Sequence, residues 1–311
     1  MQVYSSYKNI KQKHKNLVLG LGNFDGVHVG HQRLIADLVK EARNMGGTSS
    51  VLTFHPHPLE VLTGRAPLRL LTQSAKEQTI RQLGVEVLLL IPFTLEFASQ
   101  SPALFIENLL VGEINIRAVF VGYNYTFGRG GEGTPQTLVE AGKMYNFEVF
   151  VVPPVTVDGI PVSSTLIRGM LADGEVAEAK KYLGYYPFLE GLVVAGEKRG
   201  RTLGFPTANL HLEDGLTVPA NGVYAVGVQV DGDDYLGVAN IGVKPTFQGF
   251  GARPNLEVHL LDFHSDLYGK RIKVILTRRI REEKRFTSPG ELIEQIRVDI
   301  NNVRTALSGI E

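Results

Sequence analysis

The chain has 311 residues, of which 43% are hydrophobic and 21% charged, a composition typical of a globular protein with more than one domain. Its 32 Lys and Arg residues balance its 32 Asp and Glu residues, which removes the general electrostatic argument for binding nucleic acid or an anionic membrane. The absence of cysteine excludes disulfides, thiolate metal sites and cysteine nucleophiles, and it fits a reducing compartment. The first apolar run, 17–21, is too short for a signal peptide or a membrane span. We therefore expect a cytoplasmic protein that binds neither nucleic acid nor membranes. The sequence leaves the oligomeric state open and allows a transient homo-oligomer.

Short apolar runs alternate with segments of helical periodicity over the first half of the chain. The expected strands are 17–21, 50–54, 85–91, 118–121 and 148–152, and the expected helices are 32–44, 74–83, 102–110 and 135–145. Such alternation predicts an α/β fold in which helices cover a parallel sheet and ligands bind at the carboxyl ends of its strands. Two further helical stretches, 166–172 and 175–183, lead to an expected domain boundary at Tyr186.

The pattern changes to β-rich runs separated by glycine and aspartate turns after this boundary. The runs are 191–195, 222–230, 235–241, 256–261 and 273–277. Several short strands at close spacing predict a small β-barrel, and the apolar residues at helical intervals in 289–307 predict a helix that closes it. We thus expect two domains, 1–186 and 187–311.

Two histidines, His28 and His31, follow the first expected strand and lie at the start of a helix. Free backbone N–H groups at a helix start stabilise a phosphate, and Gly22, Asn23 and Gly30 supply close backbone approach and an amide donor. A His-x-x-His pair alone is more often structural or metal-binding. The dense run Gly-Asn-Phe-Asp-Gly-Val-His-Val-Gly-His is far more specific, and it predicts a nucleotide-phosphate site.

This run resembles the signature of the HxGH nucleotidyltransferase superfamily, in its bacterial flavin-adenylating branch. The segments 53–58, 121–128 and 163–168 resemble three further motifs of that branch. The resemblance implies a Rossmann-like domain in which an FMN phosphate oxygen attacks the α-phosphate of ATP and pyrophosphate leaves. The implied roles are phosphate charge stabilisation by His28, His31 and Arg168, phosphate binding by Gly22, Asn23, Gly30, Ser164 and Thr165, and flavin binding by His57, Asn124 and Tyr125. His55 is interpreted as a solvated capping residue.

A glycine-rich basic loop, 196–204, precedes Thr207 and Asn209, whose side-chain oxygens suit a Mg²⁺-bound nucleotide. The loop matches neither the Walker A pattern nor the glycine-rich loop of protein kinases. If the run Gly-Phe-Pro-Thr-Ala-Asn did not follow it, the loop would be better interpreted as a hairpin with a solvated basic tip.

That run, 204–209, resembles the signature of bacterial riboflavin kinases, as do the segments 219–225, 238–247 and 256–263. The resemblance implies that Glu257 is the general base, taking the proton of the ribityl 5′-hydroxyl as it attacks the γ-phosphate of ATP. By its local sequence alone, Glu257 is more typical of a solvent-facing strand residue. The resemblance places the nucleotide at Gly196, Arg201 and Gly204, and Mg²⁺ at Thr207 and Asn209.

A basic cluster near the C-terminus is interrupted by two glutamates, so we interpret it as a solvated loop. Its members are Arg278, Arg279, Arg281, Lys284 and Arg285, interrupted by Glu282 and Glu283.

The two motif sets together resemble the bacterial bifunctional riboflavin kinase/FMN adenylyltransferase family. The resemblance implies a six-stranded-type barrel as the kinase domain, riboflavin, FMN, FAD and ATP or ADP as ligands, and Mg²⁺ as cofactor. Two alternatives stay open. An enzyme that adenylylates a pantetheine or nicotinate compound would leave 187–311 unexplained, and a non-catalytic flavin-binding module is disfavoured because residues of both transfer sites are intact.

Overall fold

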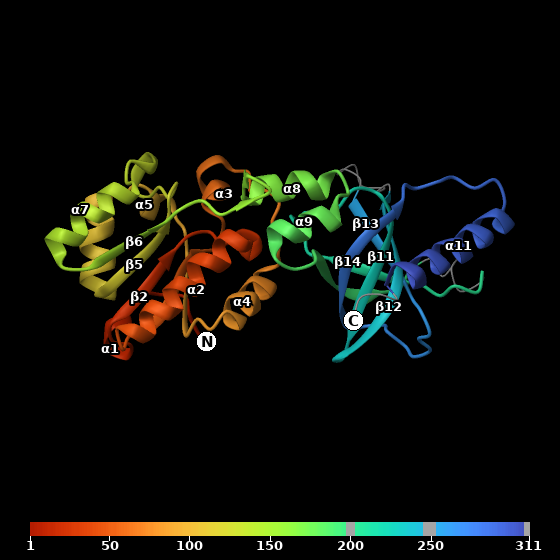
Figure 1. Cartoon of the computed structure of the whole chain (residues 1–311), viewed down its shortest axis with the longest axis horizontal. Coiled ribbons are helices and arrows are strands. Elements are labelled where there is room, and N and C mark those ends of the chain that lie inside the picture. Colours follow the sequence, from red (N-terminus) through yellow and green to blue (C-terminus); the bar gives the residue numbers. More distant parts are fainter. Residues whose placement is uncertain (197–202, 245–252, 308–311) are drawn as a thin grey trace. The chain divides into compact units, whose positions relative to one another are not determined.

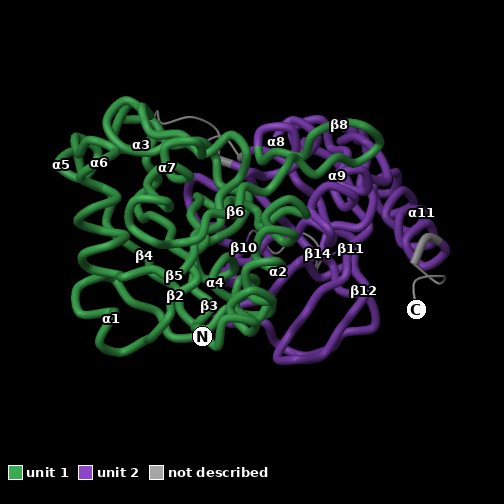
Figure 2. The backbone as a smooth tube through the Cα atoms, turned by 60° about the vertical axis from the view of Figure 1, so that its left-hand side comes forward, with its two compact units in different colours: residues 1–164 green, residues 165–311 purple. Residues whose placement is uncertain are grey.

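The computed structural model describes residues 1–196, 203–244 and 253–307. Its contacts divide the chain into two compact units, Met1–Ser164 and Thr165–Glu311 (Figure 2). The division leaves most of α8 (Ser164–Ala172) and all of α9 (Val176–Leu183) in the second unit. The functional boundary expected at Tyr186 stays a prediction.

The first unit is built on a six-stranded parallel sheet with the strand order β1-β4-β3-β2-β5-β6 (Figure 1). The strands are β1 (Gln2–Tyr4), β2 (Leu17–Leu21), β3 (Thr48–Phe54), β4 (Val87–Ile91), β5 (Ile116–Gly122) and β6 (Glu148–Val152). Every residue of β2 is buried, which explains why its sequence is continuously apolar instead of alternating. The predicted parallel α/β sheet is confirmed, whereas β1, with only three residues, is too short for the sequence to predict a strand. A small hairpin, β7 (Thr156–Val157) and β8 (Ile160–Pro161), lies outside the sheet.

Helices cover both faces of this sheet (Figure 1). They are α1 (Ile10–Lys13), η1 (Asp25–Val27), α2 (Val29–Asn44), α3 (Pro58–Thr63), α4 (Gln73–Gln82), α5 (Leu95–Ala98), α6 (Pro102–Leu104), η2 (Phe105–Ile114), η3 (Arg129–Gly131) and α7 (Pro135–Tyr145). On one face α2 approaches β2 closely, because a side chain at Gly20 would collide with Leu38 at 2.8 Å. On the other face, side chains of α1, η2 and α7 share one buried core with the strands.

The segment after α6 differs from the prediction, because η2 is a π-helix that continues to Ile114 instead of an α-helix ending at 110. Its buried residues include Phe105, Leu109, Leu110 and Ile114. Together with the buried Ile106 they have a spacing that an α-helix would also give, so the local sequence does not reveal the π-helix. These side chains pack into the core shared with the sheet.

The second unit contains a closed antiparallel barrel with the strand order β10-β13-β12-β11-β14-β9. The strands are β9 (Phe188–Val194), β10 (Ala208–Leu212), β11 (Gly222–Val230), β12 (Asp233–Lys244), β13 (Arg253–Leu260) and β14 (Arg271–Arg281). The predicted six-stranded barrel is confirmed, and closure leaves its strands without an unpaired edge. The sixth strand is β10, which lies in a segment that the sequence presents as a ligand-binding loop.

The predicted C-terminal helix, α11 (Pro289–Leu307), packs on the barrel through Val303, which is buried with Ala225 and Leu261. Asp299 of α11 is only 2% exposed and accepts two hydrogen bonds from Arg281, from Nε at 3.0 Å and from Nη2 at 2.8 Å. The interpretation of the basic cluster as a solvated loop is therefore wrong for Arg278, Arg279 and Arg281, which all belong to β14. Packing against α11 gives the Arg281 charge a buried partner that the local sequence does not reveal.

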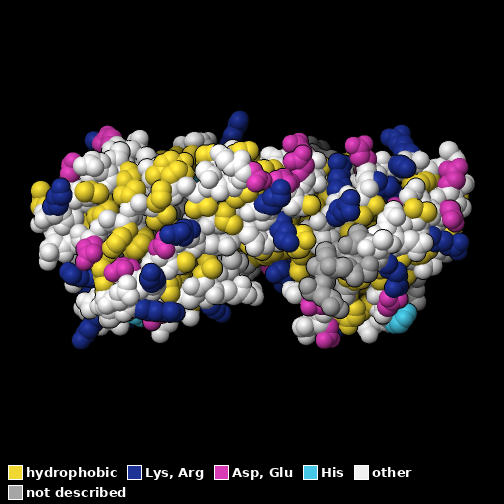
Figure 3. Space-filling view, in the orientation of Figure 1, with side chains coloured by type: hydrophobic (Ala, Val, Ile, Leu, Met, Phe, Trp, Pro, Cys, Tyr) yellow, Lys and Arg dark blue, Asp and Glu magenta, His cyan; other side chains and the backbone are white. Residues whose placement is uncertain are grey.

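Basic and acidic side chains are interspersed on the face of the molecule drawn in Figure 3, as the balanced composition suggests. Within the described residues, we find no helix that combines the length and the apolar character needed to cross a bilayer.

Candidate active sites

The predicted residues of the first site follow three neighbouring parallel strands. Asn23 comes after β2, His57 after β3 and Asn124 after β5. The carboxyl ends of parallel strands meet at one edge of a sheet, so these residues lie along the same edge. Because β3 and β5 flank β2 on opposite sides, the chain order reverses there, and such a switch point is where open α/β sheets bind ligands.

The turn between β2 and α2 has an unusual backbone that its sequence makes accessible. Phe24 and Gly26 adopt positive φ angles of 50° and 76°. A Cβ atom at Gly26 would also lie 2.6 Å from Cδ1 of Leu70, so only glycine fits this position without displacing its neighbour. At Gly30, a Cβ atom would lie 3.2 Å from the imidazole of His28, so this glycine leaves room for the ring.

The two histidines of the motif form one stacked unit. His28 is the N-cap of α2, and its Nδ1 accepts a hydrogen bond from the His31 backbone N–H at 3.4 Å. The imidazoles stack with centroids 3.6 Å apart and an angle of 15° between their planes. An Nδ1 that accepts leaves the proton of a neutral His28 on Nε2. Among the described residues, the buried Nδ1 of His31 has no hydrogen-bond partner.

Burial keeps both imidazoles neutral near pH 7. It lowers the pKa of His28 to about 4, and it lowers the pKa of His31 well below the usual range, with smaller contributions from the charges of His28 and Lys76. In the chain without nucleotide, the pair therefore offers hydrogen bonds and little charge. A phosphate bound against the rings would favour their protonated forms and raise these pKa values.

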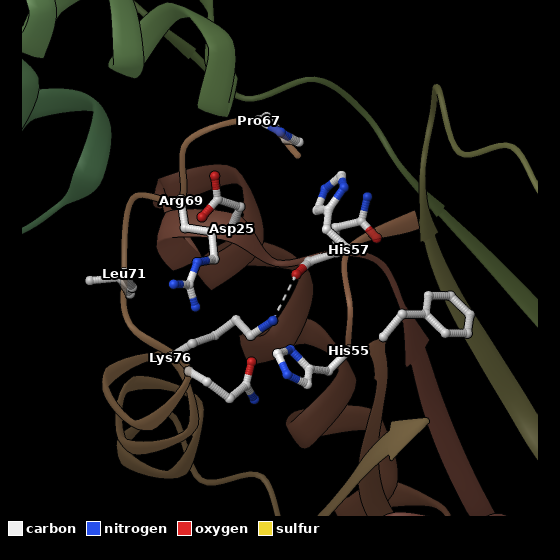
Figure 4. A pocket seen from close by; sticks show the side chains of 10 residues that line it. Asp25, His55, His57, Pro67, Arg69, Leu71 and Lys76 are labelled. Atoms are coloured by element: carbon white, nitrogen blue, oxygen red, sulfur yellow. Dashed lines mark hydrogen bonds between the residues drawn. The ribbon is translucent and has the colours of Figure 1, made fainter. Parts of the chain in front are cut away.

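A pocket lies beside this turn (Figure 4). It is lined by Asn23, Asp25, Phe54, His55, His57, Pro67, Arg69, Leu71, Gln73 and Lys76. Of the predicted site residues it contains Asn23 and His57. His57 is also the N-cap of α3, where its Nδ1 accepts from the Leu59 amide at 3.1 Å. His55 is exposed, as expected of a solvated residue, yet it too lines the pocket.

The sequence interpretation missed two cations of this pocket, Arg69 and Lys76. Both lie in or just before α4, a segment without a recognised motif. Asp25 ties that segment to the histidine turn, because its Oδ1 accepts from the Leu70 amide at 2.9 Å. The only signal in the sequence is a pair of cations seven residues apart beside the apolar residues Leu70 and Leu71, which alone is weak.

The Ser-Ser-Thr motif falls at the division between the two units. Ser164 Oγ donates to the backbone oxygen of Asp25 at 2.9 Å, which links this serine to the histidine turn within the first unit. In the second unit, Arg168 Nη2 donates to Thr165 Oγ1 at 3.0 Å on the first turns of α8.

The remaining predicted residues of the first unit differ in exposure. Gly22 directly follows β2, and its backbone N–H donates to the backbone oxygen of Leu52 at 3.3 Å. Asn124 is exposed, whereas Tyr125 is partly buried and stacks on Phe127 with centroids 6.0 Å apart. Burial raises the pKa of the Tyr125 hydroxyl. Tyr125 thus also contributes to the packing of the sheet core.

In the second unit, the barrel brings the predicted kinase residues together. Asn209 of β10 and Asn240 of β12 are both register partners of Glu257 on β13. Asn209 is buried, and Glu257 Oε1 accepts from Asn255 Nδ2 at 2.9 Å. Thr207 lies two residues before Asn209, so the alternation of the chain entering β10 favours the same face for both.

The glycine-rich loop contacts this site at one of its ends. The backbone at Gly196 lies directly against the Asn209 side chain, which a Cβ atom at position 196 would displace. Gly204 has a positive φ angle of 88°, which favours glycine. The predicted nucleotide-binding residue Arg201 lies outside the described residues.

His259 is a further residue of this site that the sequence interpretation missed. One of its ring nitrogens, Nδ1, lies 2.8 Å from the backbone oxygen of Pro206, and its ring meets Phe205 edge-on. It lies two residues after Glu257 on β13, hence on the same face of the strand. His259 therefore anchors the Gly-Phe-Pro-Thr run beside Glu257.

The oxygen donors of this site suit a Mg²⁺ ion that is bound together with a nucleotide. Thr207, Asn209 and Glu257 offer hydroxyl, amide and carboxylate oxygens. Across the residues that the structure describes, no group of three or more His, Cys, Asp or Glu side chains forms a metal cage. Mg²⁺ commonly takes one or two protein ligands together with substrate phosphates, so this donor set fits it.

Comparison with known proteins assigns each half of the chain to a family. The family model for FAD synthetase matches residues 10–166, and the model for riboflavin kinase matches residues 183–307. The bifunctional riboflavin kinase/FMN adenylyltransferase of Bacillus subtilis is 42% identical over 295 residues, which cover 93% of this chain and 92% of that protein. The protein of the same description from Escherichia coli K12 is 41% identical over 302 residues, covering 96% of each chain.

A solved structure also matches almost end to end. It is titled as a macrolide-efflux protein from Streptococcus pneumoniae, is 35% identical, and covers 97% of this chain and 98% of its own, with a TM-score of 0.89. The two family models, in this order and over this length, agree with the α/β unit and the barrel described above. The chain belongs to the family of bifunctional riboflavin kinase/FMN adenylyltransferases.

Proposed function

We propose that this chain makes FAD in two ATP-dependent steps, phosphorylating riboflavin in the barrel unit and adenylylating the resulting FMN in the α/β unit. The observation that carries this proposal is the match to both family models in one chain, over nearly the whole length of relatives described by both activities. The alternative of a different adenylylating enzyme does not account for the barrel.

In the first unit, His28 and His31 receive the phosphates of ATP at the start of α2. Their stacking, the buried His31 Nδ1 that has no partner among the described residues, and their place at the start of α2 support this role. Asn23, with close backbone approach at Gly22 and Gly30, binds phosphate beside them. Transfer needs no covalent intermediate, because an FMN phosphate oxygen attacks the α-phosphate directly and pyrophosphate leaves.

Arg168, Ser164 and Thr165 complete the phosphate contacts of the adenylyl step. The hydrogen bonds from Ser164 to the Asp25 carbonyl and from Arg168 to Thr165 support a hydroxyl-rich phosphate-binding turn. The flavin lies toward His57, Asn124 and Tyr125, at the ends of the strands next to β2.

In the second unit, Glu257 is the general base. It takes the proton from the ribityl 5′-hydroxyl as that oxygen bonds to the γ-phosphorus and ADP leaves. Thr207 and Asn209 hold Mg²⁺, which neutralises phosphate charge when bound, and Gly196, Arg201 and Gly204 contact the nucleotide. The pairing of Asn209 with Glu257 across β10 and β13 supports placing base and metal ligands side by side.

Four broader predictions belong to the same proposal. The functional boundary lies at Tyr186, the protein works in the cytoplasm, and any homo-oligomer is transient. It does not act on nucleic acid or membranes.

The experiment is incubation of the purified chain with riboflavin, ATP and Mg²⁺, followed by chromatographic separation of the flavins. FMN should rise first and FAD should follow. A preparation that yields neither FMN nor FAD would rule out the proposed function and favour a non-catalytic flavin-binding module.

A further inference from the structure

The pocket beside the histidine turn contains two cations that no motif accounts for, Arg69 and Lys76. Their charged ends extend toward the same space in Figure 4. Asp25 is the one carboxylate among the residues that line the pocket, and its Oδ1 is engaged by the Leu70 amide. The lining therefore carries more positive than negative charge, although the whole chain is neutral.

Lys76 is half-buried. In the described part of the chain it forms no ion pair, and its Nζ donates a long hydrogen bond, 3.4 Å, to the backbone oxygen of Asn23. Burial lowers the pKa of Lys76 to about 8, against the attraction of Asp25 and Glu77, and the nearby Arg69 charge lowers it further. Asp25 offsets only part of the positive charge of Arg69 and Lys76, so a bound phosphate would gain charge-assisted hydrogen bonds here.

The pocket also adjoins the adenylyl-transfer site. The Asn23 carbonyl that accepts from Lys76 accepts from Thr53 Oγ1 at 3.1 Å as well, which fixes it at the start of the histidine turn. The Lys76 charge is close enough to His31 to disfavour protonation of that imidazole. An anion bound by Lys76 would therefore lie near the groups that face the ATP phosphates.

We propose that Lys76 and Arg69 form a phosphate subsite of the adenylyl-transfer unit, in addition to the one proposed at the helix start, and that it holds a phosphate group of a substrate beside the stacked histidines. The proposal rests on the adenylyl transfer proposed above. Its chemical logic is that two phosphate-bearing substrates must approach each other, while the neutral histidines supply hydrogen bonds but little charge. The phosphate comes either from FMN or from the nucleotide, and the two sources are separable by kinetics.

The test is steady-state kinetics of FAD formation with Lys76→Met, Lys76→Arg and Arg69→Gln, varying FMN at saturating ATP and ATP at saturating FMN. Loss of a charge-assisted hydrogen bond should lower kcat/KM about 10- to 100-fold in Lys76→Met. Lys76→Arg should recover most of that loss, because it keeps the charge. An increase in KM for FMN identifies the flavin phosphate, and an increase in KM for ATP identifies the nucleotide.

Riboflavin phosphorylation in the same preparations is the internal control, since it occurs in the other unit. Lys40→Met is the matched control variant, because Lys40 is an exposed lysine of the same unit on α2. If Lys76→Met does not fold, Arg69→Gln carries the same test. The inference would be overturned by wild-type FAD kinetics in Lys76→Met and Arg69→Gln, or by equal losses in Lys76→Arg and Lys76→Met. A wild-type chain that forms FMN but no FAD would instead reject the proposed adenylyl transfer itself.

Discussion

The imidazoles of His28 and His31 stack 3.6 Å apart at the first turn of α2, with the Nδ1 of His28 accepting from the backbone of His31. This relationship fixes how the pair can act. Two cationic rings at this distance would repel each other, so the pair is stable with neutral rings until an anion arrives. In the proposed adenylyl-transfer site, the histidines would therefore act as preorganised hydrogen-bond donors, and fixed cations nearby would supply the charge.

Stability should depend on pH through His28. Its pKa lies near 4 when folded and near 6.5 when unfolded, so the unfolded chain binds more protons between these values. The free energy of unfolding therefore rises with pH through this window and levels off above it. Between pH 6.5 and 5, His28 alone should account for a loss of about 1.5 kcal/mol. Denaturant titrations of wild type and His28→Gln measure this difference, and an identical pH dependence in the variant would refute it.

Gly30→Ala should impair FAD formation through the shape of the site. The added Cβ would lie 3.2 Å from the His28 ring and must push the imidazole out of its stack. We expect kcat/KM for FAD formation to fall at least about tenfold, since small misplacement of a positioning group is costly. Gly290→Ala is the control, because its Cβ would make only an ordinary contact at 3.9 Å in α11. Equal activity of the two variants would show that the Gly30 contact is unimportant.

Asn209→Ala should weaken the metal dependence of the kinase step alone. The change removes one proposed oxygen ligand, so the Mg²⁺ concentration that gives half-maximal FMN formation should rise about tenfold. FAD formation from supplied FMN should keep its wild-type metal dependence. His211→Ala is a matched control on the same strand, because His211 is exposed two residues away. A Mg²⁺ response unchanged in Asn209→Ala would remove this residue from the proposed metal site.

Asp299→Ala should destabilise the barrel unit, because it leaves the largely buried guanidinium of Arg281 without its carboxylate. Breaking a buried ion pair from one side typically costs about 3 to 5 kcal/mol. The free energy of unfolding from denaturant titration measures the loss. The exposed pair of Arg33 and Asp37 provides the contrast, since Asp37→Ala should cost less than about 1 kcal/mol. Similar losses in both variants would contradict the role given to burial.

The sequence predicts elements well where a local pattern and the tertiary environment agree. The barrel strand β11 and the helix α11 have the predicted bounds, because a β-rich apolar run in one and apolar periodicity in the other match the surfaces that they bury. The strand β1 has only three residues, two of them exposed, and it exists through pairing with β4. Such pairing depends on residues more than 80 positions away, which no local pattern encodes.

The candidate sites, too, combine features that the local sequence predicts with features that it does not. The glycine and histidine spacing at His28 predicts a helix start that binds phosphate, but it does not predict the stacking of the rings or their low pKa values. Lys76 and Arg69 are ordinary cations in the sequence, and they join the site only because Asp25 holds the Leu70 backbone against the histidine turn. Contacts of this kind form between segments that have no shared periodicity, so they appear only in the folded chain.

The central claim is that one chain carries two separate transfer sites, one at His28 and one at Glu257. The most direct measurement is chromatographic separation of the flavins formed by His28→Ala and by Glu257→Ala, each supplied with ATP and Mg²⁺. With riboflavin, His28→Ala should accumulate FMN at the wild-type rate while FAD formation falls about 100-fold or more. Glu257→Ala should form almost no FMN from riboflavin, yet it should convert supplied FMN to FAD at the wild-type rate. Loss of both steps in either folded variant would contradict the claim.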